Sequence, residues 1–367
     1  MNDDSRPPVD STLVAFAVAI AKEAGTYTLG YFQDSTLDVE GKDDGTPVTV
    51  ADLALCHLET PLTTDLTDLS GYPHFNGPAS WADHLLDVGF DGCSTASNHV
   101  VDQGLQGALD TVAAFEASGL GQAGIAVTEA DATTPVLYDA AGITIGHVSA
   151  TLSTNGIPIP RSAPWLVSGI DPEGLLSAAQ RAQEAGAEFV VVSLHWGVEY
   201  RSAPTDSQRA LAETLLSSTE VDLIVGHHAH VIQPIGMVGD EYVVYGMGNF
   251  LTNQSASCCV LSSQDGVIVE IELHETDTGI RAQRVVVTPT RVDRADGYRV
   301  IDVGAALAED PENATLAASW PGWRPARPSV RWVAWSPRWS DPDWPWRPDR
   351  FPDRRSGSPR ASEPPVR

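Results

Sequence analysis

The stretch of sequence that decides the fold holds two apolar runs, FVVVSLH at residues 189–195 and VDLIVGHHAH at residues 221–230. Between them, Thr205 and Gln208 stand three residues apart, as in a capping box, where each side chain bonds an otherwise unpaired backbone N–H. A helix is therefore expected to begin at this point. A strand, a helix and a second strand in so few residues predict a βαβ unit with parallel strands.

Histidines stand at the carboxyl ends of both predicted strands. Parallel strands point the same way, so these ends meet at one edge of the sheet, where open α/β sheets bind ligands. Neutral imidazole is a common ligand of transition metals, so the set predicts a metal or phosphate site. In the alternative interpretation, the first histidine is a hydrogen-bonded core residue and the others form an exposed polar loop. The set consists of His195, His227, His228 and His230.

Length, charge and apolar patterning limit the classes of protein. A chain of 367 residues holds one large domain or two small ones and can bury a sizeable core. The net charge of -27 argues against a nucleic-acid-binding surface, so an anionic substrate would need a local cation such as a metal ion. Without an apolar run of about 18 residues or an export signal, we expect no membrane span and a cytoplasmic location.

The four cysteines follow no spacing typical of a zinc site or of a disulfide framework. Cys56 and Cys93 stand near the ends of predicted strands and can be neighbours, whereas Cys258 and Cys259 are adjacent in sequence. We interpret all four as buried or idle thiols.

The first 51 residues have a different character from the rest. The apolar run from Leu13 to Ile20 continues at helical spacing into Lys22 and predicts an amphipathic helix. Together with EGKDDGTPVTVAD at residues 40–52, it resembles the start of an inositol-monophosphatase-like or histidinol-phosphatase-like enzyme. The downstream D-P-x-D-G-T cluster of that family is absent, so we expect a fragment of helix plus loop rather than such a phosphatase.

Two further segments bring polar side chains to strand ends. The apolar run in residues 52–62 carries Glu59 at its end, and residues 90–97 lead to Asn98 and His99. Carboxylate and amide oxygens can bind a metal, and the neighbouring histidine can act as a general acid or stabilise charge on a substrate oxygen. The alternatives are a solvated loop for Glu59 and a turn in which Asn98 caps the helix that follows.

The remaining pattern alternates strands and helices before it changes class. Residues 142–150 predict a strand, and Asp171 with Pro172 begins a helix that feeds the strand at residue 189. Alternation in residues 267–273 predicts that the globular part closes on antiparallel strands. Residues 320–367 are rich in proline, arginine and tryptophan, which predicts a disordered tail.

A set of short motifs is similar in order and spacing to one known family. They are LETP at 58–61, GFD at 89–91, N-H-x-x-D-x-G at 98–104, NG at 155–156, S-L-H-W-G-x-E-Y at 193–200, P-T-x-x-Q at 204–208, D-L-I-V-G-H-H-x-H at 222–230, QP at 233–234 and GNF at 248–250. From Asp52 to about Val292 the chain resembles the capsule-synthesis CapA family, which is associated with poly-γ-glutamate biosynthesis and belongs to the calcineurin-like metallophosphoesterase superfamily.

This resemblance implies a layered α/β/β/α sandwich whose rim binds two divalent metal ions (Mn, Fe, Zn or Mg). Such a pair can generate hydroxide at neutral pH and hold a phosphoryl oxygen. By position, the implied metal ligands are Asn98, His195, His228 and His230, with Glu59 as a ligand or near neighbour and His227 as a further possible ligand. His99, beside Asn98, would be the substrate-facing acid.

The chain departs from the family pattern at its start. The family begins with a strand ending in Gly-Asp, whose aspartate binds metal, and no such strand is evident upstream of Asp52; His57 also replaces the asparagine usual before Leu-Glu. A sheet without its first strand exposes backbone groups or recruits a substitute. Either the first 51 residues supply that substitute, or the gene is rearranged and its site is incomplete.

We therefore expect an N-terminal fragment at 1–51, a CapA-like metallophosphatase domain at 52–295, a C-terminal extension at 296–319 and the tail at 320–367. The predicted function is capsule or poly-γ-glutamate biosynthesis with a metal-dependent hydrolase site. The expected substrate is an anionic polymer or phosphoester, and other capsule-synthesis proteins are candidate partners. The alternatives are a non-catalytic accessory or polymer-binding protein and an inactive truncated fusion product. Family members are often exported or membrane-anchored, which this sequence does not provide for.

Overall fold

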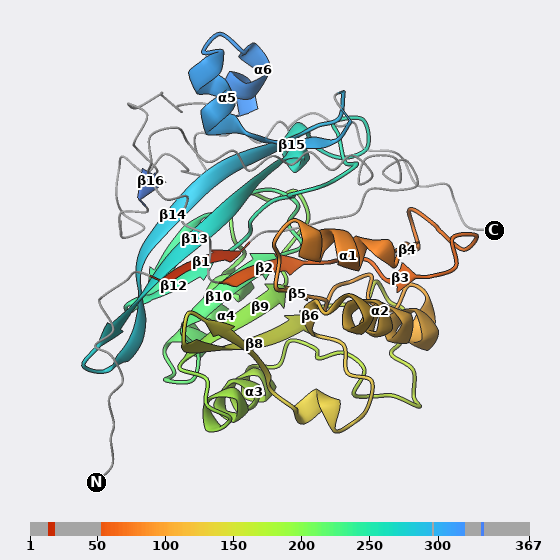
Figure 1. Cartoon of the computed structure of the whole chain (residues 1–367), viewed down its shortest axis with the longest axis vertical. Helices are drawn as coiled ribbons and strands as arrows, with labels where there is room; N and C mark the ends of the chain where they lie inside the picture. Colours follow the sequence, from red (N-terminus) through yellow and green to blue (C-terminus); the bar gives the residue numbers. More distant parts are fainter. Residues whose placement is uncertain (1–13, 19–52, 296, 320–331, 334–367) are drawn as a thin grey trace, which may run out of the picture.

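The computed structural model describes residues 14–18, 53–295, 297–319 and 332–333. Two mixed β-sheets pack face to face and helices cover their outer faces, as Figure 1 shows. One sheet has eight strands, with seven in the order β15-β14-β13-β1-β2-β5-β6 and β16 paired to β14; the other has six, in the order β11-β12-β10-β9-β8-β7. The predicted α/β sandwich is confirmed.

The six-stranded sheet is built around the apolar runs at residues 189–195 and 221–230. Its parallel strands are joined by α3 and α4, so both predicted βαβ units are confirmed. Thr205 and Gln208 form the expected capping box at the start of α4, and Asp171 caps α3 by accepting a hydrogen bond from the Gly174 N–H. The strands are β7 (Val136–Ala140), β8 (Ile143–Thr151), β9 (Phe189–His195), β10 (Leu223–His227), β11 (Ile235–Val238) and β12 (Glu241–Val244).

The eight-stranded sheet has a parallel half and an antiparallel half. The antiparallel strands β13 and β14 form the long hairpin expected at the end of the globular part. The strands are β1 (Val14–Val18), β2 (Leu53–His57), β5 (Gly92–Ser94), β6 (Gly121–Ala123), β13 (Asp265–Thr276), β14 (Gly279–Asp293), β15 (Arg299–Asp302) and β16 (Trp332–Val333). A separate pair is formed by β3 (Leu62–Thr63) and β4 (Gly77–Pro78).

The helices lie on the outer faces of the sheets and at one end of the molecule. Buried side chains of α1 and α2 pack on β2 and β5, and those of α3 and α4 pack on β8, β9 and β10. A third cluster fills the space between the sheets. The helices are α1 (Ser80–Asp87), α2 (Gly104–Ser118), α3 (Pro172–Glu184), α4 (Asp206–Leu216), α5 (Val303–Glu309) and α6 (Ala314–Ser319), with 3-10 turns η2 (Asp131–Thr133) and η3 (Leu261–Gln264).

The expected helix at Leu13–Ile20 is wrong, because residues 14–18 form the strand β1. This strand lies between two others, antiparallel to β13 and parallel to β2. The physical reason is the position: without β1, the facing edges of β2 and β13 would leave backbone groups unpaired in the middle of the sheet. The first 51 residues thus supply the substitute strand that the sequence required.

The cysteines are not idle thiols. The structure pairs Cys56 with Cys93 and Cys258 with Cys259. The first pair follows from the sheet, since Cys56 of β2 and Cys93 of β5 are register partners on neighbouring parallel strands. The second joins adjacent residues in the loop after β12.

Several expectations fall outside the described residues. Of the N-terminal fragment only Val14–Val18 is described, and of the tail only β16, which pairs with β14. The domain boundaries therefore stay predictions. Among the described residues, none of the helices has both the length and the hydrophobicity needed to cross a bilayer.

A buried carboxylate ties β9 and β10 together. Asp222 accepts a hydrogen bond of 2.8 Å from the Val190 N–H and lies 3.4 Å from the guanidinium of Arg281, which also pairs with Glu241. Burial raises the pKa of Asp222 from 3.8 to about 6, despite this hydrogen bond and this cation. The folded protein therefore favours the protonated carboxyl.

The raised pKa gives a stability prediction with a definite sign. The contribution of Asp222 to folding is fully present below pH 3.8 and is lost as the pH rises to about 6. A shift of about two units corresponds to about 2–3 kcal/mol at most. We expect Asp222→Asn to flatten the fall in unfolding free energy between pH 4 and pH 7, measured by urea denaturation. Glu213→Gln, on the exposed face of α4, serves as the control and should leave the slope unchanged.

Candidate metal centre

The carboxyl ends of strands from both sheets meet at one place. His57 ends β2 and His195 ends β9, and the His57 Nε2 and His195 Nδ1 atoms lie 3.0 Å apart. His227 ends β10 and is the register partner of His195. The His227 ring stacks on His57 with 4.2 Å between centroids. The sandwich therefore brings histidines from separate segments together, as expected from the strand ends.

The first group of candidate ligands consists of His57, Glu59 and His195. One ligand atom from each lies within 4.8 Å of the others. All three residues are at most 2% exposed. The His57 Nδ1 atom lies 2.8 Å from the Ser94 hydroxyl, which orients the ring and leaves Nε2 directed to His195.

The second group consists of Glu199, His228 and His230, again with ligand atoms within 4.8 Å of one another. His230 is buried, whereas the side chain of Glu199 is 43% exposed, so this group lies nearer the surface. The His230 Nδ1 atom lies 3.2 Å from the Asn249 Oδ1 atom. In metal sites, a hydrogen bond to the second ring nitrogen of a histidine ligand fixes the orientation of the ring in this way.

Glu59 links the two groups. Its Oε1 atom lies 3.9 Å from the His195 Nε2 atom and 3.8 Å from the His230 Nε2 atom. A buried carboxylate between two sets of imidazoles occupies the position from which one side chain can serve two cations.

The backbone of the second group is strained. His228 has a φ of 86° and His230 a φ of 55°, a region that residues other than glycine rarely adopt. Such conformations persist where the surrounding structure imposes them, and they gather at functional sites. In this loop they place two histidines, separated by one residue, on the same group.

Asn98 and His99 follow β5 and lie beside the first group. The Asn98 Oδ1 atom is 3.0 Å from the His195 Nε2 atom, and the Asn98 amide nitrogen donates to Asn155 at 3.2 Å. His99 is held by Asp102, with 2.7 Å between Nδ1 and Oδ2. The same Asp102 oxygen accepts from the N–H of Phe75, whose ring meets the His99 ring edge-on.

Burial keeps the imidazoles of His195 and His227 neutral. Burial, followed by the surrounding histidines, holds the pKa of His195 well below 6.5, and burial lowers the pKa of His227 to about 3. A neutral imidazole has a lone pair for a metal ion, whereas the protonated ring does not. Each of these two rings can therefore offer a lone pair to a cation at neutral pH.

One predicted ligand, His227, lies outside the two groups of candidate ligands, whereas Asn98 places its Oδ1 atom 3.0 Å from the His195 Nε2 atom. His99, the predicted acid, lies outside both groups. Both ring nitrogens of His227 lack a hydrogen-bond partner among the described residues. The roles of these three residues stay predictions.

Two residues of the groups were missed in the sequence. His57 precedes Glu59 by two positions, and in an extended chain such residues share a side, so the strand spacing held the signal. Glu199 follows His195 by four positions in a loop, where no periodic rule applies.

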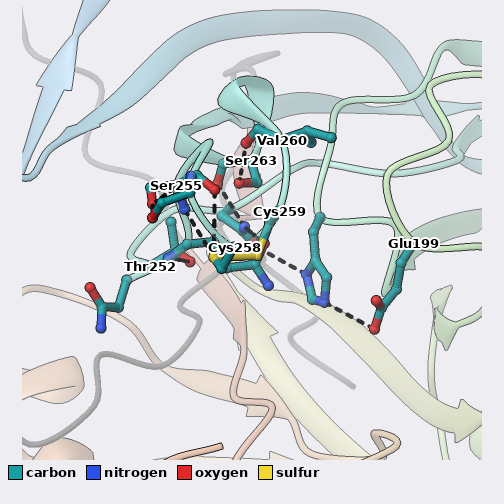
Figure 2. The surroundings of a disulfide bond; sticks show 12 residues. Glu199, Thr252, Ser255, Cys258, Cys259, Val260 and Ser263 are labelled. Atoms are coloured by element: carbon teal, nitrogen blue, oxygen red, sulfur yellow. Dashed lines mark hydrogen bonds and ion pairs between the residues drawn. A yellow bond between two sulfur atoms is a disulfide. The ribbon is translucent and has the colours of Figure 1, made fainter. Parts of the chain in front are cut away.

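The loop after β12 borders the second group through Asn249. The Asn249 amide nitrogen donates to the Ser263 carbonyl and lies 3.4 Å from the Gln254 Oε1 atom. Figure 2 shows the disulfide between Cys258 and Cys259 in this loop, with Glu199 in its surroundings.

Comparison with known proteins decides the family. Residues 46–254 match the model of the bacterial capsule synthesis protein PGA_cap. The chain belongs to this family. The PGA biosynthesis protein CapA of Bacillus subtilis is 33% identical over 213 residues, which cover 58% of this chain and 53% of that protein. The capsule biosynthesis protein CapA of Bacillus anthracis is 29% identical, with 56% and 50% covered.

A probable polyglutamine synthesis accessory protein of Mycobacterium tuberculosis is 27% identical over 222 residues, 55% of this chain and 56% of that protein. The chain thus spans about half the length of the curated relatives it matches. Among solved structures, the calcineurin-like phosphoesterase YfkN of Bacillus subtilis gives a TM-score of 0.45 at 13% identity, with 84% and 99% covered. A putative 5′-nucleotidase of Staphylococcus aureus gives 0.46 at 14%, with 77% and 55% covered.

The donor set of this PGA_cap chain fits divalent metal ions. Buried neutral imidazoles together with carboxylates are the ligands that zinc, iron and manganese accept. The aspartate ligand expected after the first strand is not present there, because β1 is followed by Ala-Ile-Ala-Lys-Glu rather than by Gly-Asp. Here β1 supplies the strand without the aspartate, while His57 adds an imidazole to the centre.

Proposed function

We propose that this chain is a metal-dependent hydrolase of the phosphoesterase type, acting on an anionic polymer or phosphoester in capsule or poly-γ-glutamate metabolism. The observation that carries the proposal is the position of Glu59, whose Oε1 atom lies within 4 Å of an imidazole nitrogen in each group. Two adjacent cation sites sharing a carboxylate suit the displacement of an oxygen from a phosphoryl or acyl centre.

The proposal assigns a metal ion to each group. His57, Glu59 and His195 would hold the first, and Glu199, His228 and His230 the second, with Asn98 and His227 as further candidates. Bound divalent ions, of which Mn, Fe, Zn and Mg are candidates, supply a nucleophilic hydroxide at neutral pH and offset charge on the substrate. This also answers the charge problem of an acidic protein with an anionic substrate.

His99 is the proposed acid. Its Nδ1 atom is held by Asp102, which leaves Nε2 for a substrate oxygen. Proton donation from this nitrogen would assist departure of the leaving group. The Phe75 ring packs against His99 and limits its movement.

The test combines metal analysis with a substrate panel of phosphodiesters and γ-glutamyl peptides. We expect the purified protein to contain divalent metal and to turn over at least one class of substrate. His195→Ala should abolish this turnover, at least about 100-fold, while leaving the fold largely intact, because it removes one imidazole from the first group. Circular dichroism confirms folding.

Two outcomes would contradict the proposed hydrolase function or the role of His195 in it. Folded protein that contains no metal and turns over no member of the panel would exclude it. Unchanged turnover in His195→Ala would refute the role of that residue. Arg161→Gln changes an exposed residue that belongs to neither group and serves as the control.

A second function is a non-catalytic accessory or polymer-binding protein. The absence of Gly-Asp after β1 favours it, because a missing carboxylate ligand weakens a catalytic centre more than a binding one. In that case the protein binds metal and poly-γ-glutamate, and polymer binding depends on His195 and His230, without turnover. Chelator-sensitive binding of poly-γ-glutamate without turnover of any member of the substrate panel would identify the accessory function, whereas metal-dependent turnover would identify the hydrolase.

A further inference from the structure

A cavity of about 210 Å³ lies at the edge of β8, beyond the point where its pairing with β7 ends. Its walls come from β6, the segment of η2, the strand β8 and the helix α3. The polar side chains that matter here are Gln122, Thr134, His147, Ser149, Trp165 and Arg181.

This cavity shares no lining residue with the candidate metal centre, since none of its residues belongs to either group of metal-ligand candidates. A ligand here would therefore be bound by a different set of side chains from those that hold the metal ions.

The wall of the cavity holds polar atoms without partners. The His147 Nδ1, Ser149 Oγ and Trp165 Nε1 atoms make no hydrogen bond to any part of the chain that the structure describes. His147 and Ser149 are only 3% and 6% exposed, and the other ring nitrogen of His147 lies 2.9 Å from the Ser193 hydroxyl. Buried polar groups are nearly always bonded, so three unpaired atoms on residues that line one cavity point to a polar partner from outside the described chain, reached by small side-chain rotations.

The cavity also has a cation. Arg181 stands in the last turn of α3 and forms no ion pair with a described residue. The lining set includes one carboxylate, that of the exposed Asp131, and one of its oxygens accepts the Thr128 N–H at 2.7 Å. His147 does not add charge, because burial lowers its pKa to about 4. Arg181 is the only arginine or lysine among the described residues that line the cavity, and its charge favours an anionic ligand.

We propose that this cavity binds a small molecule bearing a carboxylate or phosphate group, with the Arg181 guanidinium on the oxyanion and Ser149 and Trp165 as further hydrogen-bond donors. The volume of the cavity suits a ligand smaller than a drug molecule, because pockets for drug-sized molecules measure about 300–1,000 Å³ and this one measures about 210 Å³. A guanidinium presents paired N–H donors that match an oxyanion.

The test measures binding of two probes, inorganic phosphate and succinate, to the full metal-loaded chain by titration calorimetry and nitrogen-15 NMR. We expect one of the probes to bind and to shift the indole N–H signal of Trp165, identified by its loss in Trp165→Phe. Arg181→Gln should weaken binding at least tenfold, and Ser149→Ala, which keeps the charge, several-fold. Arg161→Gln removes an exposed arginine outside the cavity and should have no effect.

His195→Ala separates this site from the metal centre and should retain binding. The inference is overturned if neither probe binds, if Arg181→Gln and Ser149→Ala both bind as the parent does, or if binding is lost in His195→Ala instead. The preference between the two probes distinguishes a phosphate ligand from a carboxylate ligand.

Discussion

Replacing Glu59 with glutamine is expected to lower the divalent metal content of both groups at once, with affinity at least about 100-fold weaker. The reason is its position, with Oε1 within 4 Å of an imidazole in each group. Glutamine keeps the volume but removes the charge that two cations would share. Metal analysis and metal-dependent thermal stabilisation measure the effect, because a ligand that binds only the folded state raises the melting temperature.

Substitutions in one group provide the comparison. His195→Ala should affect mainly the first group and His228→Ala mainly the second, so each should leave more metal bound than Glu59→Gln. Without metal, Glu59→Gln should be close to the parent protein in stability, because glutamine keeps the volume of this buried side chain. If Glu59→Gln retained metal in both groups, the carboxylate would not be shared.

The proximity of the candidate ligands was largely predictable because it rests on one topological rule. Parallel strands end on the same edge, so apolar runs that stop at His195 and His227 already indicate a common rim. The same rule applied to β2 and β5 placed Glu59 and Asn98 beside them, and their distances to His195 agree.

The residues that were missed show where this rule stops. His57 was interpreted as a departure from a family motif rather than as the residue two positions before Glu59 on an extended segment. The disulfide of Cys56 and Cys93 needs the register of β2 against β5, which apolar patterning does not fix to a single residue. A helix was predicted at Leu13–Ile20 because a short apolar run fits either period, and tertiary pairing decides between them.

The strand β1 gives the second large prediction, because it is central to its sheet. Ala17 pairs with Glu270 of β13 on one side and with Ala54 of β2 on the other. Proline has no N–H and a fixed φ, so it is excluded from the middle of a sheet. The strand β2 in turn carries His57 and leads to Glu59, so a disturbance of β1 reaches the metal centre.

We therefore expect Ala17→Pro to destabilise the protein by at least about 2 kcal/mol, since a buried carbonyl left unpaired costs about 1–3 kcal/mol before any strain is added. The metal content should fall with it, because His57 and Glu59 lose their support. Urea denaturation and metal analysis measure both effects, and Ser5→Pro, upstream of the strand, is the control. Equal stability and metal content in the two variants would mean that β2 and β13 do not depend on residues 14–18, and the substitute for the family's first strand would have to be sought elsewhere in the chain.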